Sequence, residues 1–229
     1  MKQAEISPEL LATLRQISAE HCLKEGGSHG PDHTERVLQN ALAIGRRMGA
    51  RLDILTPAAL LHDIGRNAES RSHGGVCHAE VGADMAGPIL RELGWSEDDQ
   101  AAVCHCIRSH RFRGSTEPES LEAQILFDAD KLDSIGAVGI GRAFLFAGQI
   151  GAKLHNAELD HENTAAYSGE DTAYREFQVK MSKVRGQMLT TIGRKIARKR
   201  HEFMEIFFAE LNLEIYGSVV QVEADDKEL

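Results

Sequence analysis

Four residues in the first 130 positions constrain this chain most: His33, the adjacent pair His62-Asp63, and Asp130. Imidazole nitrogen and carboxylate oxygen together suit Mn, Fe, Co, Ni or Zn, and carboxylate also admits Mg. Four protein ligands on an octahedral ion leave about two positions for water or a phosphate oxygen, which is typical of a catalytic site. A buried His-Asp pair that binds no metal is the alternative explanation of the doublet.

Helical spacing of apolar residues runs through nearly the whole chain and predicts an all-α fold. We expect Asp32 to cap a helix that begins at His33, and Ser96 to cap another. Thr56-Pro57 should begin the helix that carries His62 and Asp63, because proline is favoured at the first helical position. The expected helices span 6–23, 33–48, 56–65, 76–93, 97–109, 121–132 and 136–146.

The C-terminal third divides into a polar segment and two further helices. Residues 153–171 have no clean period, which predicts a long loop or lid. The first helix that follows should bury one apolar stripe, Phe177, Met181, Val184 and Met188. The second should bury Ile192, Ile196, Phe203 and Phe207. The one strand-like stretch, 216–222, is too short to build a sheet alone.

The composition fits a single domain in the cytoplasm. The chain has 229 residues, of which 42% are hydrophobic, and a formal net charge of −9. A protein with this negative net charge is not expected to bind a nucleic acid polymer, but it can still bind a small phosphorylated substrate. We find no signal peptide, no membrane span and no disulfide framework among the four cysteines. We expect one domain over 1–229, with a core at about 20–150 and a C-terminal helical extension at about 172–212.

Three motifs carry a family resemblance: GSHGPDHTERVL around His33, AALLHDIGR around His62 and Asp63, and FDADKLDSIGAVGIGRAF around Asp130. They resemble the HD-domain superfamily of metal-dependent phosphohydrolases. The resemblance implies an HD-domain helical bundle in which these four residues converge on one divalent metal, Mn before the others. The family's last motif reads small residue, ligand Asp, basic residue, Leu, which selects Asp130 over Asp128 and Asp133. Asp128 is then expected to be a solvated or capping carboxylate.

The C-terminal segment FQVKMSKVRGQMLTTIGRKIARKRHEFMEIFF resembles the tail of the bacterial YpgQ/YedJ-type subgroup. That subgroup is associated with hydrolysis of nucleoside triphosphates to monophosphate and pyrophosphate. The resemblance therefore implies a nucleotide substrate attacked by a metal-bound hydroxide. Several HD nucleotidases have an acidic general base three positions after the doublet, where this chain has Arg66. This departure disfavours a monophosphate nucleotidase and gives the base role to metal-bound water or to Asp133.

Further candidate residues surround the expected centre. Lys131 and Arg36 are our first candidates for stabilising charge on the phosphoryl oxygens. Asp133 could orient water, act as a base, or hold a ligand histidine. Arg66 and Arg200 are candidates for substrate binding, and surface cations or salt bridges are the alternative for each cation. An inward Arg200 needs an anionic partner, so it could close the pocket or form a buried ion pair.

The remaining histidines leave alternatives open. His78 and His110 could bind a second metal or the substrate phosphates, or could hydrogen-bond between helices, which we favour. Zinc binding by Cys104, Cys106 and His110 is disfavoured because the two cysteines lie about 200° apart on a helix. We expect the other isolated histidines at the surface, namely His21, His29, His73, His155, His161 and His201.

Two rival functions remain. A di-iron oxygenase of the HD type would need His78 and His110 as extra ligands. A nucleotide-sensing protein without turnover is disfavoured because all four metal ligands are present. A homodimer is left open.

Overall fold

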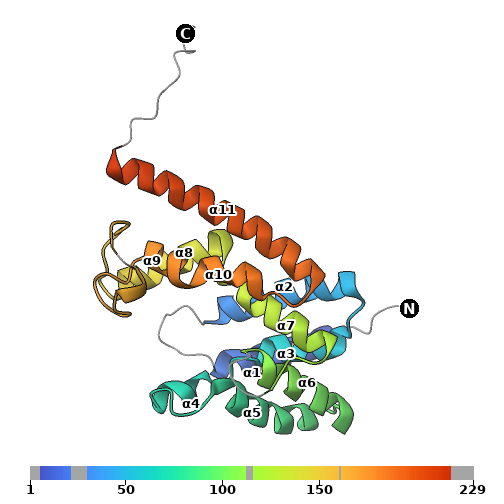
Figure 1. Ribbon diagram of the computed structural model, residues 1–229. Coiled ribbons are helices and arrows are strands. Elements are labelled where there is room, and N and C mark those ends of the chain that lie inside the picture. The colour runs from blue at the N-terminus through green and yellow to red at the C-terminus, as the bar shows by residue number, and fades with distance from the viewer. Residues whose placement is uncertain (1–5, 22–29, 112–115, 160, 218–229) are drawn as a thin grey trace.

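The computed structural model describes residues 6–21, 30–111, 116–159 and 161–217. All regular secondary structure in these ranges is helical, which confirms the all-α fold (Figure 1). The elements are α1 (Pro8–His21), α2 (Pro31–Met48), α3 (Leu52–Leu61), α4 (Arg66–Arg71), α5 (His78–Glu92), α6 (Glu97–Ser109), α7 (Leu121–Leu132), α8 (Gly136–Gln149), η1 (His161–Asn163), α9 (Ala173–Glu176), η2 (Phe177–Met181), α10 (Ser182–Val184), η3 (Arg185–Gln187) and α11 (Thr191–Tyr216).

Helices α2, α3 and α7 form the centre of the bundle. The helix pairs α2–α3, α2–α7 and α3–α6 pack together, and α5 lies against α6. Helix α11 crosses the other side of the molecule, over α7 and α8 (Figure 1). Every residue of α3 except Asp53 is buried, so this helix runs through the hydrophobic core.

Local capping fixes the helix boundaries that we predicted best. The Ser96 hydroxyl accepts the amide of Asp99 at the start of α6, and the Ser120 hydroxyl accepts the amide of Ala123 at the start of α7. Both helices have the predicted bounds. The Asp32 cap was wrong, because α2 begins at Pro31 with Gly30 before it. Proline at the first helical position explains that start.

The predicted start and end of the third helix were both wrong. Helix α3 begins at Leu52 and contains Pro57 in its interior, because burial of Leu52, Ile54 and Leu55 outweighs the cost of the proline. The helix ends at Leu61, so His62 and Asp63 lie in the turn before α4 and not within a helix.

The C-terminal part differs more from the prediction. The first predicted helix is broken into α9, the π-helical turn η2, α10 and η3, although its apolar stripe is buried as expected. Helix α11 buries a different stripe from the predicted one: Gly193, Ala197, His201, Met204 and Phe208. Phe203 is 47% exposed, and His201 is only 4% exposed, contrary to its predicted surface position. The close approach of Gly193 to α7 helps to determine which face of α11 is buried, because a Cβ on Gly193 would lie 2.1 Å from Asp128 Oδ2.

Residues 153–171 form a loop, as predicted, with η1 as its one short helical turn in the described part. Asn156 donates to the Glu170 carbonyl, and Arg175 donates to Asp171 and to the Thr164 carbonyl. The role of residues 153–171 as a lid stays a prediction. The predicted strand-like stretch 216–222 lies almost entirely outside the described residues. Among the described helices, none combines the length and apolar character needed to cross a bilayer.

Candidate metal centre

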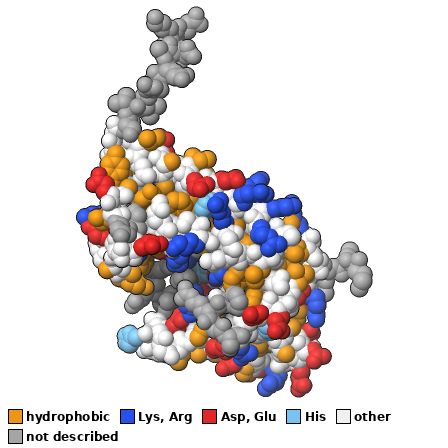
Figure 2. Space-filling model, viewed as in Figure 1, with side chains coloured by type: hydrophobic (Ala, Val, Ile, Leu, Met, Phe, Trp, Pro, Cys, Tyr) orange, Lys and Arg blue, Asp and Glu red, His pale blue; other side chains and the backbone are white. Residues whose placement is uncertain are grey.

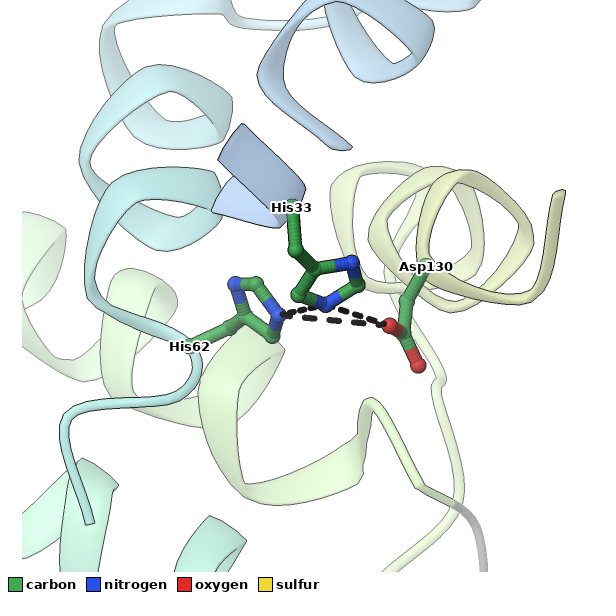
Figure 3. A group of neighbouring side chains, drawn as sticks. All are labelled: His33, His62 and Asp130. Carbon is green, nitrogen blue, oxygen red and sulfur yellow. Dashed lines mark hydrogen bonds and ion pairs between the residues drawn. The ribbon is translucent and has the colours of Figure 1, made fainter. Parts of the chain in front are cut away.

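Three separate parts of the bundle bring the predicted ligands together (Figure 3). His33 lies in the first turn of α2, His62 in the turn after α3, and Asp130 in the last turn of α7. The Nε2 atoms of His33 and His62 are 3.4 Å apart. Asp130 Oδ1 lies 3.4 Å from the first of these nitrogens and 3.9 Å from the second. The candidate ligand atoms lie close enough to one another to hold a metal ion.

Asp63 joins this group through one carboxylate oxygen. Its Oδ2 lies 3.6 Å from His33 Nε2 and 3.5 Å from His62 Nε2. All four predicted ligands therefore converge, from α2, the turn after α3, and α7.

The other oxygen of Asp63 faces a second pair of histidines. Its Oδ1 lies 3.3 Å from His78 Nε2 and 3.7 Å from His110 Nε2. His78 begins α5 and His110 follows the end of α6, and their Nε2 atoms are 3.2 Å apart. One carboxylate between two groups of imidazoles is suited to bridging two cations. This geometry favours the metal-ligand alternative for His78 and His110 over contacts between helices alone.

Each of the four imidazoles is held by its other ring nitrogen. His62 Nδ1 lies 2.8 Å from the Ala59 carbonyl, and His110 Nδ1 lies 2.6 Å from the Ile107 carbonyl. A carbonyl only accepts, so each Nδ1 carries the proton and leaves Nε2 as a lone-pair donor. His33 and His78 are oriented in the same way by carboxylates, Asp133 and Glu69, each at 2.7 Å. Such outer partners are usual for metal-binding histidines.

The electrostatics of the cluster also fit a cation. Burial lowers the pKa of His62 and lowers that of His110 to about 3, so both are neutral and ready to coordinate. Burial opposes ionisation of Asp130, but His33 and the neighbouring imidazoles outweigh it and hold the pKa well below its usual range. Burial likewise opposes the charged form of His33, yet Asp130 and Asp133 raise its pKa to about 9. Metal binding must therefore displace a proton from His33.

Asp133 uses both carboxylate oxygens on its neighbours. Arg36 makes a two-point contact with it, Nε to Oδ1 at 2.6 Å and Nη2 to Oδ2 at 3.1 Å. Arg142 Nη1 lies 2.6 Å from Oδ2, which is also the atom bonded to His33. Burial opposes its ionisation, but the hydrogen bonds from His33 and Arg36 lower the pKa of Asp133 to about 2. Of the three roles considered, this geometry favours holding a ligand histidine.

The predicted cations lie in different surroundings. Arg66 Nε donates to Asp63 Oδ2 at 2.6 Å, which places a guanidinium directly at the centre. Lys131 Nζ lies 4.2 Å above the ring of Phe127. Arg200 donates to the Leu132 carbonyl and to Asn40 Oδ1, so it links the end of α7 to α2. The prediction of an anionic partner for Arg200 was therefore wrong, because a backbone carbonyl oxygen and a side-chain amide oxygen accept its hydrogen bonds.

Sequence reasoning missed three residues of the site: Glu69, Arg111 and Arg142. Glu69 accepts from His78 and from Arg111 at 2.5 Å. Arg142 lies inside the motif quoted around Asp130, which was the available signal. Asp128 is fully buried and accepts hydrogen bonds from the amides of Leu189 and Thr190, just before α11, whereas Thr190 caps that helix. The expectation of a solvated or capping carboxylate was therefore wrong.

Comparisons with known proteins bear on this geometry. The family model described as HD domain matches residues 32–135. YpgQ of Bacillus subtilis (strain 168) is 34% identical over 197 residues, or 84% of this chain and 87% of YpgQ. Its crystal structure in complex with ADP is similar to this chain at a TM-score of 0.69 and 28% identity, covering 90% of this chain and 97% of that one. A solved HD superfamily hydrolase from an uncultured Thermotogales bacterium is 31% identical, with a TM-score of 0.66 and coverage of 89% and 92%.

Proposed function

This chain belongs to the HD-domain superfamily, and from that premise we propose that it is a metal-dependent phosphohydrolase that converts a nucleoside or deoxynucleoside triphosphate to the monophosphate and pyrophosphate. Its solved relatives support a hydrolase in general terms. One observation carries the proposal: the buried imidazole nitrogens and the carboxylates of Asp63 and Asp130 converge beside an arginine.

We assign the metal to His33, His62, Asp63 and Asp130, with Mn as the first candidate ion. Their donor set of imidazole and carboxylate fits a divalent transition metal. A bound divalent ion would lower the pKa of a water molecule and polarise a phosphoryl oxygen. We further propose that His78 and His110, with Asp63 Oδ1, provide a second metal position.

The chain's own residues then divide the remaining work. Arg66 already lies against Asp63 and is positioned to bind a phosphoryl oxygen that enters the centre. The side chain of Arg36 is 37% exposed although it contacts Asp133, so it is accessible to an anionic substrate. Lys131 stays a candidate for the same task. Asp133 keeps His33 in place, which leaves no general-base role for it in this proposal.

Support for a nucleotide comes from a relative. YpgQ was crystallised in complex with ADP. A nucleotide supplies the phosphates that a metal and nearby guanidinium groups would bind. The proposed products, a monophosphate and pyrophosphate, follow from the subgroup resemblance, and Arg66 in place of an acidic base disfavours a monophosphate nucleotidase.

The test is turnover of a nucleotide panel by chelator-treated protein reloaded with Mn, Co, Ni or Mg, with separate assays for pyrophosphate and phosphate. Asp63→Ala should lower metal-dependent hydrolysis by more than about 1,000-fold, because a metal supplies several kcal/mol of transition-state stabilisation. The matched control is Asp98→Ala, an exposed carboxylate in the first turn of α6, which should keep wild-type turnover. Full turnover by Asp63→Ala after reloading would refute the assignment.

A second candidate function rests on the second histidine group. An HD-type di-iron oxygenase would use His78 and His110 as iron ligands, and Asp63 would lie between the irons. Two irons per chain together with oxygen-dependent turnover would favour this function over hydrolysis. Tight nucleotide binding with no turnover under any metal would instead indicate a sensor.

A further inference from the structure

Helix α11 carries a second row of residues beside its buried face, and this row is largely exposed. Its members follow one another at alternating intervals of three and four, and we call them the α11 seam: Ile196, Lys199, Phe203, Ile206, Glu210 and Leu213. Within the seam Phe203 is 47% exposed, Ile206 69% and Leu213 41%. In Figure 1 the other labelled helices all lie on one side of α11, so the helix forms an edge of the molecule. A partner can therefore reach the seam.

The spacing of the seam is that of a coiled coil. Two seam positions recur every seven residues, and such a repeat keeps one side of a helix facing a neighbouring helix. At 1.5 Å per residue the seam is about 25 Å long. The buried face of α11, with Ala197, Met204 and Phe208, already packs on the bundle. The bundle therefore holds the helix in place, and the seam presents an apolar row to a helix from outside this chain.

The charges of α11 are divided along its length. Residues 191–203 contain five Lys or Arg and one Glu, whereas residues 204–216 contain three Glu and no Lys or Arg. Figure 2 shows Lys and Arg side chains gathered over the N-terminal part of this helix. This order is the reverse of the one that the helix macrodipole favours. An antiparallel helix of the same sequence would place the acidic half of each helix beside the basic half of the other.

The two charged residues of the seam point to a second copy of this chain as the partner. Lys199 and Glu210 lie equally far from the middle of the seam, which falls between residues 204 and 205. Antiparallel pairing with a second copy therefore brings Lys199 level with Glu210 of the partner subunit. Within the described part of the chain, neither charge forms an ion pair. Parallel pairing would instead oppose like charges, which is unfavourable, and an unrelated partner would not require this symmetry.

We propose that two copies of this chain form a symmetric dimer through antiparallel packing of their α11 seams. Each contact in such a two-fold interface occurs twice, so two pairs of Lys199 with Glu210 flank a centre made by Phe203 and Ile206. The apolar centre supplies affinity, and the flanking charges set the direction and alignment of the helices. This proposal concerns assembly and does not depend on what the metal centre hydrolyses.

Sedimentation equilibrium of the full chain over a wide range of concentration tests the proposal. Ile206→Glu should weaken the dimer by at least about 100-fold, because it places an unpaired charge at the centre of the interface on both copies. The control is Val76→Glu, which puts the same charge on an exposed apolar residue just before α5, on the far side of the bundle from α11 in Figure 1. It should dimerise like wild type. A wild-type chain that stays monomeric up to about 100 μM, or a dimer that Ile206→Glu leaves unchanged, would overturn the proposal.

Charge exchange tests the antiparallel arrangement. Lys199→Glu and Glu210→Lys should each weaken the dimer about tenfold, because each change makes both flanking pairs repulsive. An equimolar mixture of the two variants should recover wild-type affinity, because every flanking pair in the mixed dimer again joins opposite charges. Both changes affect exposed side chains, and thermal unfolding followed by circular dichroism should match wild type. Single variants that dimerise like wild type, or a mixture no tighter than either variant alone, would overturn the antiparallel arrangement.

Discussion

Asp133 is a buried carboxylate that orients three neighbouring side chains. It is 1% exposed and contacts His33, Arg36 and Arg142 at 2.6–2.7 Å. The two guanidinium groups keep it ionised, and the ionised oxygen fixes the proton of His33 on Nδ1. Once metal binding displaces the second proton of His33, the lone pair of its Nε2 faces the other proposed ligands.

Replacement of this carboxylate tests that role. Asp133→Asn keeps the size of the side chain but removes its charge, so His33 loses its charged hydrogen-bond acceptor. We expect metal affinity to fall by about 10- to 100-fold, as for other outer-sphere partners of ligand histidines. A competition titration against a metal-binding dye measures this, with Asp98→Asn as the control. Unchanged affinity would show that His33 is oriented by something else.

At the scale of elements, the turn between α3 and α4 decides the shape of the site. It lies directly on α5, because a Cβ on Gly65 would be 2.2 Å from the His78 carbonyl oxygen and 2.7 Å from the Gly82 amide nitrogen. Only a glycine permits this approach of two backbones. The contact brings Asp63 within reach of His78.

Gly65→Ala should therefore destabilise the protein by about 3 kcal/mol, the upper range for overpacking, because backbone must move to accept the methyl group. The matched control is Gly141→Ala on α8, where the new Cβ meets nothing within 4 Å. That change should stabilise by up to about 1 kcal/mol through helix propensity. Urea unfolding measures both. A Gly65→Ala variant as stable as wild type would mean that the turn does not lie against α5.

At the scale of the whole molecule, the centre joins parts of the chain that are distant in sequence. The residues proposed as ligands come from α2, the turn after α3, the start of α5, the end of α6 and the end of α7. A metal bound by His33, His62, Asp63 and Asp130 would join three of these segments and would stabilise only the folded state.

Metal removal should therefore lower the thermal midpoint. An ion at 100 times its dissociation constant adds about 2.7 kcal/mol, which is roughly 5–10 °C for a chain of this length. Thermal scans of wild type with EDTA or with Mn measure the shift, and Asp63→Ala should show little of it. An equal shift in that variant would place the stabilising ion elsewhere.

The sequence by itself determined the parts that depend on neighbours in the chain. Ser96 capped its helix where predicted, because a cap acts on amides two or three residues away. The motifs around His33, His62-Asp63 and Asp130 identified side chains that converge in the structure, and their assignment as metal ligands stays a proposal.

Tertiary packing decided the rest. Helix α3 ends before His62, and the buried face of α11 contains His201 in place of Phe203, because contacts with distant segments outweigh local periodicity. Glu69 and Arg142 joined the site for the same reason, since each reaches its partner only after the helices have packed. Spacing along a chain says which residues share a face of one helix, but only packing decides which faces meet.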